Sequence, residues 1–91
     1  MENRGTTNEE KIICLELQIQ HIIDVIEMSR SKVKTTEEII NIFPDRNCEE
    51  VNDLNMIIYQ LKCCIEIAEE KLAKVKISLE ETKKSFLLTS H

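Results

Sequence analysis

Apolar residues recur at alternating steps of three and four through the second half of the chain, and no Gly or Pro interrupts them. This is the seven-residue repeat of a helix with one apolar stripe, which is typical of coiled coils. The repeat predicts one long helix over residues 48–87, followed by a frayed tail over 88–91. The interface residues predicted on this helix are Val51, Leu54, Ile58, Leu61, Ile65, Leu72, Val75, Leu79 and Phe86.

The first half of the chain carries the same repeat. Thr7 and Glu10 have the spacing of a capping box, in which two side chains satisfy amide groups at the start of a helix. We therefore predict a first helix over residues 8–34, after a disordered segment over 1–7. The interface residues predicted on its stripe are Ile12, Leu15, Ile19, Ile22 and Ile26.

Residues 35–47 are predicted to form a connector between the two helices. The sequence Thr35-Thr36-Glu37-Glu38 offers a second capping box, which predicts a short helix that Pro44 ends. Acidic residues gather in this region, so it is either a solvated cap or a surface for a basic partner. These residues are Glu37, Glu38, Asp45, Glu49 and Glu50.

Two long helices and one connector predict an all-α fold, in which the chain folds back as an antiparallel hairpin. The second predicted helix is the longer, so about 18 Å of it would overhang the first at 1.5 Å per residue. The overhang would offer a coiled-coil strand to a partner.

The first helix is apolar beyond its stripe. An isolated hairpin would leave four further residues in water, although burying each such side chain contributes about 1.5–3 kcal/mol. We therefore predict an obligate oligomer, formed with itself or with another helical protein, and a four-helix bundle is the simplest arrangement. The four additional interface residues are Ile13, Leu17, Ile23 and Val25.

Composition argues against several classes of function. The formal net charge is −5, whereas a protein that binds nucleic acid directly usually presents a basic face. One glycine is too few for a Gly-rich phosphate loop, and no apolar run is long enough to span a membrane. We expect no catalytic residues, no metal and no cofactor. The N-terminal residues are polar, and the cysteines include no Cys-x-x-Cys pair. We therefore expect a reducing compartment, cytoplasmic or nuclear.

The leading hypothesis is a non-enzymatic scaffold or adaptor subunit. One alternative is a thiol- or metal-dependent protein that uses Cys14, Cys63, Cys64 and His21, although their spacing matches no known ligand motif. Another is an amphipathic module on a membrane surface, which normally has a lysine-rich polar face. In shape, the predicted hairpin resembles the short helical subunits of eukaryotic multi-protein assemblies, such as kinetochore and vesicle-tethering complexes.

Overall fold

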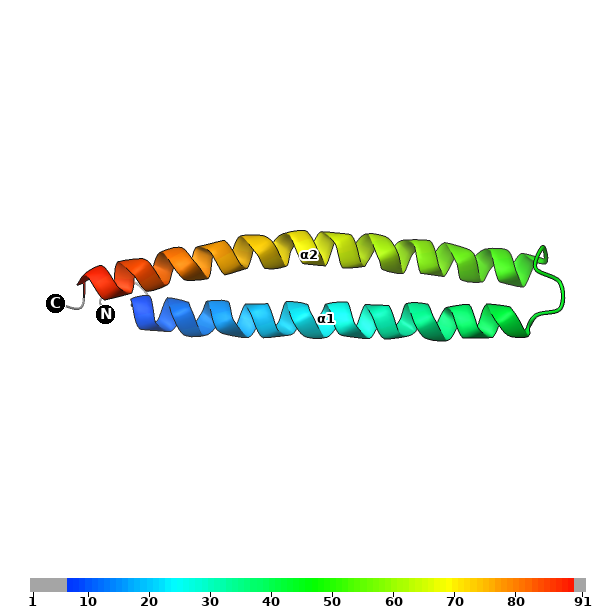
Figure 1. Ribbon diagram of the computed structural model, residues 1–91, viewed down its shortest axis with the longest axis horizontal. Helices are drawn as coiled ribbons and strands as arrows, with labels where there is room; N and C mark the ends of the chain where they lie inside the picture. Colours follow the sequence, from blue (N-terminus) through cyan, green and yellow to red (C-terminus); the bar gives the residue numbers. More distant parts are fainter. Residues whose placement is uncertain (1–6, 90–91) are drawn as a thin grey trace, which may run out of the picture.

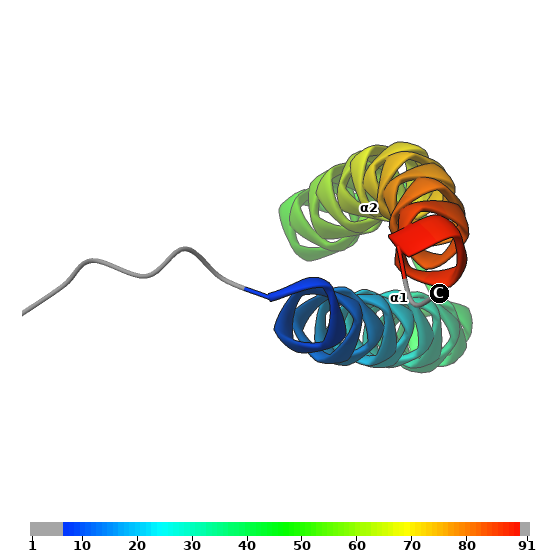
Figure 2. The ribbon, with the colours of Figure 1, turned by 90° about the vertical axis from the view of Figure 1, so that its left-hand side faces the viewer.

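The computed structural model describes residues 7–89 and contains two helices over that range. Helix α1 spans Asn8–Ile42 and helix α2 spans Glu49–Thr89. They lie side by side in opposite directions, as the predicted hairpin requires (Figure 1). Viewed along the long axis of the molecule, α2 crosses α1 at an angle (Figure 2). The molecule is an elongated rod with principal extents of 67 × 29 × 14 Å.

Helix α1 begins with the predicted capping box, which is confirmed. The Thr7 hydroxyl accepts a hydrogen bond from the Glu10 amide at 3.1 Å, and the Glu10 carboxylate accepts one from the Thr7 amide at 2.9 Å. Both amide groups would otherwise lack a partner in the first turn of the helix. Glu9 and Glu10 also place negative charge at the helix N-terminus, where the helix dipole favours it.

The C-terminal part of α1 differs from the prediction. The separate short helix expected in residues 35–47 is not formed, because α1 continues without a break to Ile42. The Thr36 hydroxyl donates to the Lys32 carbonyl at 2.7 Å, as a threonine inside a helix does, so the second capping box is also absent. The physical reason is packing: Val33, Thr36 and Ile40 continue the three-and-four spacing, and Val33 and Ile40 pack in one cluster with residues of α2.

The turn between the helices consists of residues 43–48. Phe43 has an extended backbone (φ −72°, ψ 127°), which is the conformation that a following proline favours. Within the turn, the Asp45 carboxylate accepts a hydrogen bond from the Asn47 amide at 2.9 Å. The turn is therefore shorter than the predicted connector, and α2 begins at Glu49.

The overhang of α2 is shorter than the predicted length of about 18 Å, because α2 exceeds α1 by about 9 Å. At 1.5 Å per residue, α1 is about 52 Å long and α2 about 61 Å, so the two helices are closer in length than expected. Val75 packs against Ile22 and Ile26, and the C-terminal end of α2 extends a short way past the start of α1 (Figure 1). The expected tail over 88–91 is helical at Leu88 and Thr89, and residues 90–91 lie outside the described residues. Of the segment 1–7 expected to be disordered, Thr7 is the N-cap of α1, and residues 1–6 lie outside the described residues.

The core is a narrow line of side chains between the helices. One cluster, in the middle of the rod, has Ile22, Ile26 and Val75 as its buried residues. A second cluster near the turn has Ile40, Val51 and Ile58. Val51 is the most buried of them, with 1% of its surface exposed. Two helices alone thus bury only one face of each helix.

Candidate interaction surface

The residues predicted as interface on the two stripes lie between α1 and α2. They therefore form the contact inside the hairpin, and their side chains are not a free surface for a partner. The buried ones are Ile22, Ile26, Val51, Ile58 and Val75. The half-buried ones are Ile12, Leu15, Ile19, Leu54, Leu61, Ile65, Leu72, Leu79 and Phe86.

The residues predicted outside the stripe of the first helix have a different environment. Leu17 is 66% exposed, and Ile13 and Val25 are also exposed. Ile23 is half-buried beside Arg30 and Glu69. Helix α2 contributes exposed residues that the sequence argument did not select, among them Ile67, which is 67% exposed. Both helices therefore expose apolar side chains to solvent.

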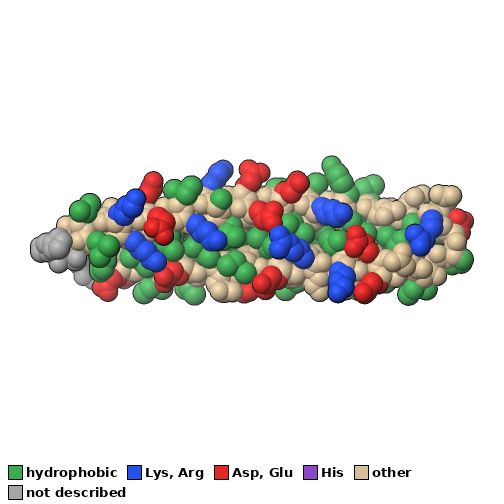
Figure 3. Space-filling view, in the orientation of Figure 1, with side chains coloured by type: hydrophobic (Ala, Val, Ile, Leu, Met, Phe, Trp, Pro, Cys, Tyr) green, Lys and Arg blue, Asp and Glu red, His purple; other side chains and the backbone are tan. Residues whose placement is uncertain are grey.

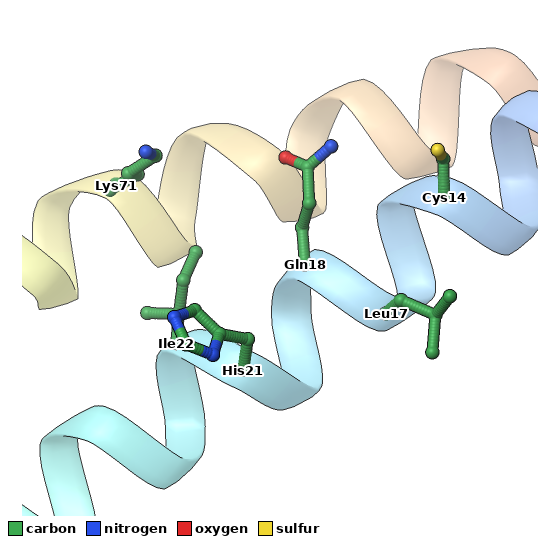
Figure 4. Close-up of a pocket in the computed structure, with 6 residues that line it drawn as sticks. All are labelled: Cys14, Leu17, Gln18, His21, Ile22 and Lys71. Atoms are coloured by element: carbon green, nitrogen blue, oxygen red, sulfur yellow. The ribbon is translucent and has the colours of Figure 1, made fainter.

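A groove runs along one flank of the hairpin. One hollow of about 380 Å³ is lined by Cys14, Leu17, Gln18, His21, Ile22 and Lys71 (Figure 4). A second hollow of about 250 Å³ shares His21, Ile22 and Lys71 and adds four residues. Because the two hollows share these residues, they form one continuous depression, which we name the apolar groove. The four added residues are Val25, Cys64, Ile67 and Ala68.

Repeat positions explain how the sequence builds this groove. Gln18 and Val25 are seven residues apart on α1, and Cys64 and Lys71 are seven apart on α2, so each pair lies on one side of its helix. These positions flank the core stripe on the same side of the hairpin. The seven-residue spacing of Ile57, Cys64 and Lys71 was the sequence signal that could have identified the α2 side of the groove.

The opposite flank of the hairpin is charged. The Arg30 guanidinium of α1 forms an ion pair with the Glu69 carboxylate of α2 on this side. A hollow nearer the turn is lined by Glu37, Lys62 and two asparagines, Asn41 and Asn55. Charges of both signs also alternate along the face drawn in Figure 3, above a line of hydrophobic side chains.

Among residues 7–89, Lys71 is the one Lys, Arg, Asp or Glu residue that lines the two main hollows of the apolar groove. Lys71 and His21 line both hollows, and no carboxylate lines either of them. Figure 4 shows that Lys71 comes from α2 while the other five labelled residues come from α1. Next to the groove, Lys74 lines a further hollow together with Ile67, Lys71 and Glu70. The groove therefore combines an apolar floor with a mainly basic rim.

The cysteines considered for thiol or metal chemistry are far apart. The short turn from Ile42 to Glu49 and the packing of Ile40 with Val51 set the register of the hairpin, in which Cys64 lies level with about residue 27 of α1. That position is about 20 Å along the axis from Cys14. Within residues 7–89, no cluster of three or more potential ligand side chains could hold a metal ion. The geometry brings none of Cys14, Cys63 and Cys64 to a common site.

The acidic residues of the connector are spread over three elements. Glu37 and Glu38 belong to the last turns of α1, Asp45 to the turn, and Glu49 and Glu50 to the first turn of α2. All five are exposed. The last two lie where a helix N-terminus favours negative charge, so part of this cluster has a structural role.

No protein-family model, curated protein or solved structure matches this chain. Neither helix over the described range combines the length and apolarity that a membrane crossing requires.

Proposed function

We propose that the chain is a non-enzymatic scaffold or adaptor subunit, which assembles with other helical chains through the surface that its own hairpin leaves uncovered. The observation that carries the proposal is the row of exposed apolar side chains on both helices. Among the described residues, this row includes Leu17, Val25, Met28, Ile57 and Ile67. Scattered apolar residues are ordinary on a protein surface, but a continuous groove of them commonly marks an interaction site.

The exposed area supports the proposal. The chain exposes 7240 Å², whereas a compact monomer of 10.6 kDa would expose about 5,500 Å². The excess, roughly 1,700 Å², reflects the elongated rod, in which each helix buries only one face. A further helical layer packed along the rod would cover part of that surface.

The proposed assembly is built on coiled-coil heptads. In this arrangement the core stripes hold the hairpin together, and the residues beside them contact the partner. A second hairpin would complete a four-helix bundle, from a copy of the chain or from another helical protein, and a single helix would complete a three-helix bundle. The obligate oligomer would work in a reducing compartment, the cytoplasm or the nucleus, where its cysteines remain thiols.

The experiment is native mass spectrometry of the complex purified from its natural source, with the tagged chain expressed at its normal level. The proposal predicts a complex of defined mass above 10.6 kDa. The substitution Ile67→Asp in the groove should remove the added mass, whereas Tyr59→Asp, which is equally exposed on α2, should leave it. A chain that is alone and folded in both preparations would contradict the proposal.

A further inference from the structure

The apolar groove has the length of one helix of moderate size. It extends from Cys14 on α1 to Cys64 on α2, and the latter lies level with about residue 27 of α1. The groove is therefore about 20 Å long, which corresponds to about 13 helical residues. A partner helix seated in it would contact both helices of the hairpin at once.

The middle of the groove is positively charged. In the register set by the turn and by the packing of Ile40 with Val51, Lys71 lies level with about residue 20 of α1 and Lys74 with about residue 17. His21 lies beside the level of Lys71 and lines both hollows with it. A partner that binds in the groove must therefore carry negative charge beside its apolar residues. Burying an ammonium group without an opposite charge costs free energy.

A second copy of the chain does not satisfy this requirement. Two grooves related by a two-fold axis bring the middle of one groove against the middle of the other. Lys71 and Lys74 of one copy would then approach the same lysines of the second copy, at the place where the apolar contact is closest. Like charges that are desolvated together oppose association.

We infer that the groove binds an acidic amphipathic helix of another protein. Its apolar residues, spaced three and four apart, would pack on Leu17, Val25 and Ile67, as helices do in hydrophobic grooves. Its Glu or Asp residues would flank that stripe and pair with Lys71 and Lys74. The inference rests on the proposed function, because it specifies the partner of the same surface.

The test is a fluorescence anisotropy titration of the full chain with two labelled helical peptides of about 20 residues. The peptides share one leucine stripe, and the flanking positions are Glu in one peptide and Lys in the other. We expect the Glu peptide to bind at least about tenfold more tightly at low salt, with the difference reduced at high salt. Ile67→Asp should weaken its binding about tenfold or more, and Tyr59→Asp should not.

A charge reversal tests the basic rim directly. Lys71→Glu should lower or reverse the preference for the Glu peptide, whereas Lys62→Glu, on the charged flank, should leave it unchanged. Circular dichroism of each variant checks that the hairpin is still helical. Equal binding of the two peptides, or equal effects of Lys71→Glu and Lys62→Glu, would overturn the inference.

Sedimentation of the chain alone separates this inference from the proposed function. A dimer that Ile67→Asp dissociates would assign the groove to a second copy, which overturns the inference and leaves the scaffold proposal standing. A monomer that binds neither peptide also overturns the inference. The scaffold proposal is contradicted only if, in addition, the chain purified from its natural source carries no partner.

Discussion

Arg30 of α1 donates a hydrogen bond to the carboxylate of Glu69 of α2, and this ion pair joins the two helices near the middle of the rod. Both side chains are largely in water, with 61% and 47% of their surfaces exposed. The pair bridges the two helices on the flank opposite to the apolar groove. Because the pair is so exposed, the core rather than the pair has to supply most of the stability.

We predict that Arg30→Ala lowers the free energy of unfolding by no more than about 1 kcal/mol, since solvent screens an exposed pair. Urea denaturation of Arg30→Ala, Glu69→Ala and the double variant measures the coupling between them. A coupling well above about 1 kcal/mol would show that the pair contributes far more than its exposure allows.

Replacing a core residue should have a much larger effect. Ile26→Ala removes a buried side chain from the central cluster and should lower the free energy of unfolding by about 2–5 kcal/mol. The matched control is Ile77→Ala on α2, where the side chain is 59% exposed, and its effect should stay within about 0.5 kcal/mol. Similar losses in the two variants would contradict the assignment of the core.

The continuity of α1 can be tested at Thr36. Inside a helix, Thr36→Pro removes a backbone hydrogen bond and should cost about 3 kcal/mol or more. At the start of a separate helix, proline would be tolerated. Thr36→Ala is the control, because it removes the hydroxyl bond to Lys32 and keeps the helix. Thermal unfolding followed by circular dichroism should show a large decrease in melting temperature for Thr36→Pro and not for Thr36→Ala.

The start of α1 should depend on its capping box. Thr7→Ala removes the acceptor for the Glu10 amide, so we expect a loss of about 1 kcal/mol in the free energy of unfolding. Thr7→Ser keeps a hydroxyl and should retain most of the stability. Hydrogen exchange of the first-turn amides should become faster in the alanine variant only.

Much of the fold could be predicted from local patterns. The spacing of apolar residues identified two long helices, and Thr7 and Glu10 located the start of the first. The error lay at Thr35-Thr36-Glu37-Glu38, where local capping residues suggested a new helix. Tertiary packing of Ile40 against α2 outweighed that local preference, and continuing the helix also shortened the predicted overhang.

The interaction surface was harder to predict. The stripe residues were predicted as an interface with a partner, but the hairpin buries them in its own core, so the free surface had to be sought beside them. Leu17 and Val25 were selected as excess apolar residues, whereas Ile67 and Lys71 were not. Their joint site depends on which residue of α2 lies level with each residue of α1, and sequence spacing within one helix does not contain that register.

The most direct test of the central claim is the intact mass of the natural complex, measured for the wild-type chain and for Ile67→Asp. The account predicts that the wild-type chain carries a stoichiometric helical partner, and that Ile67→Asp leaves a folded chain of about 10.6 kDa without it. A wild-type chain that is folded and unaccompanied would contradict it, as would a complex that survives Ile67→Asp unchanged.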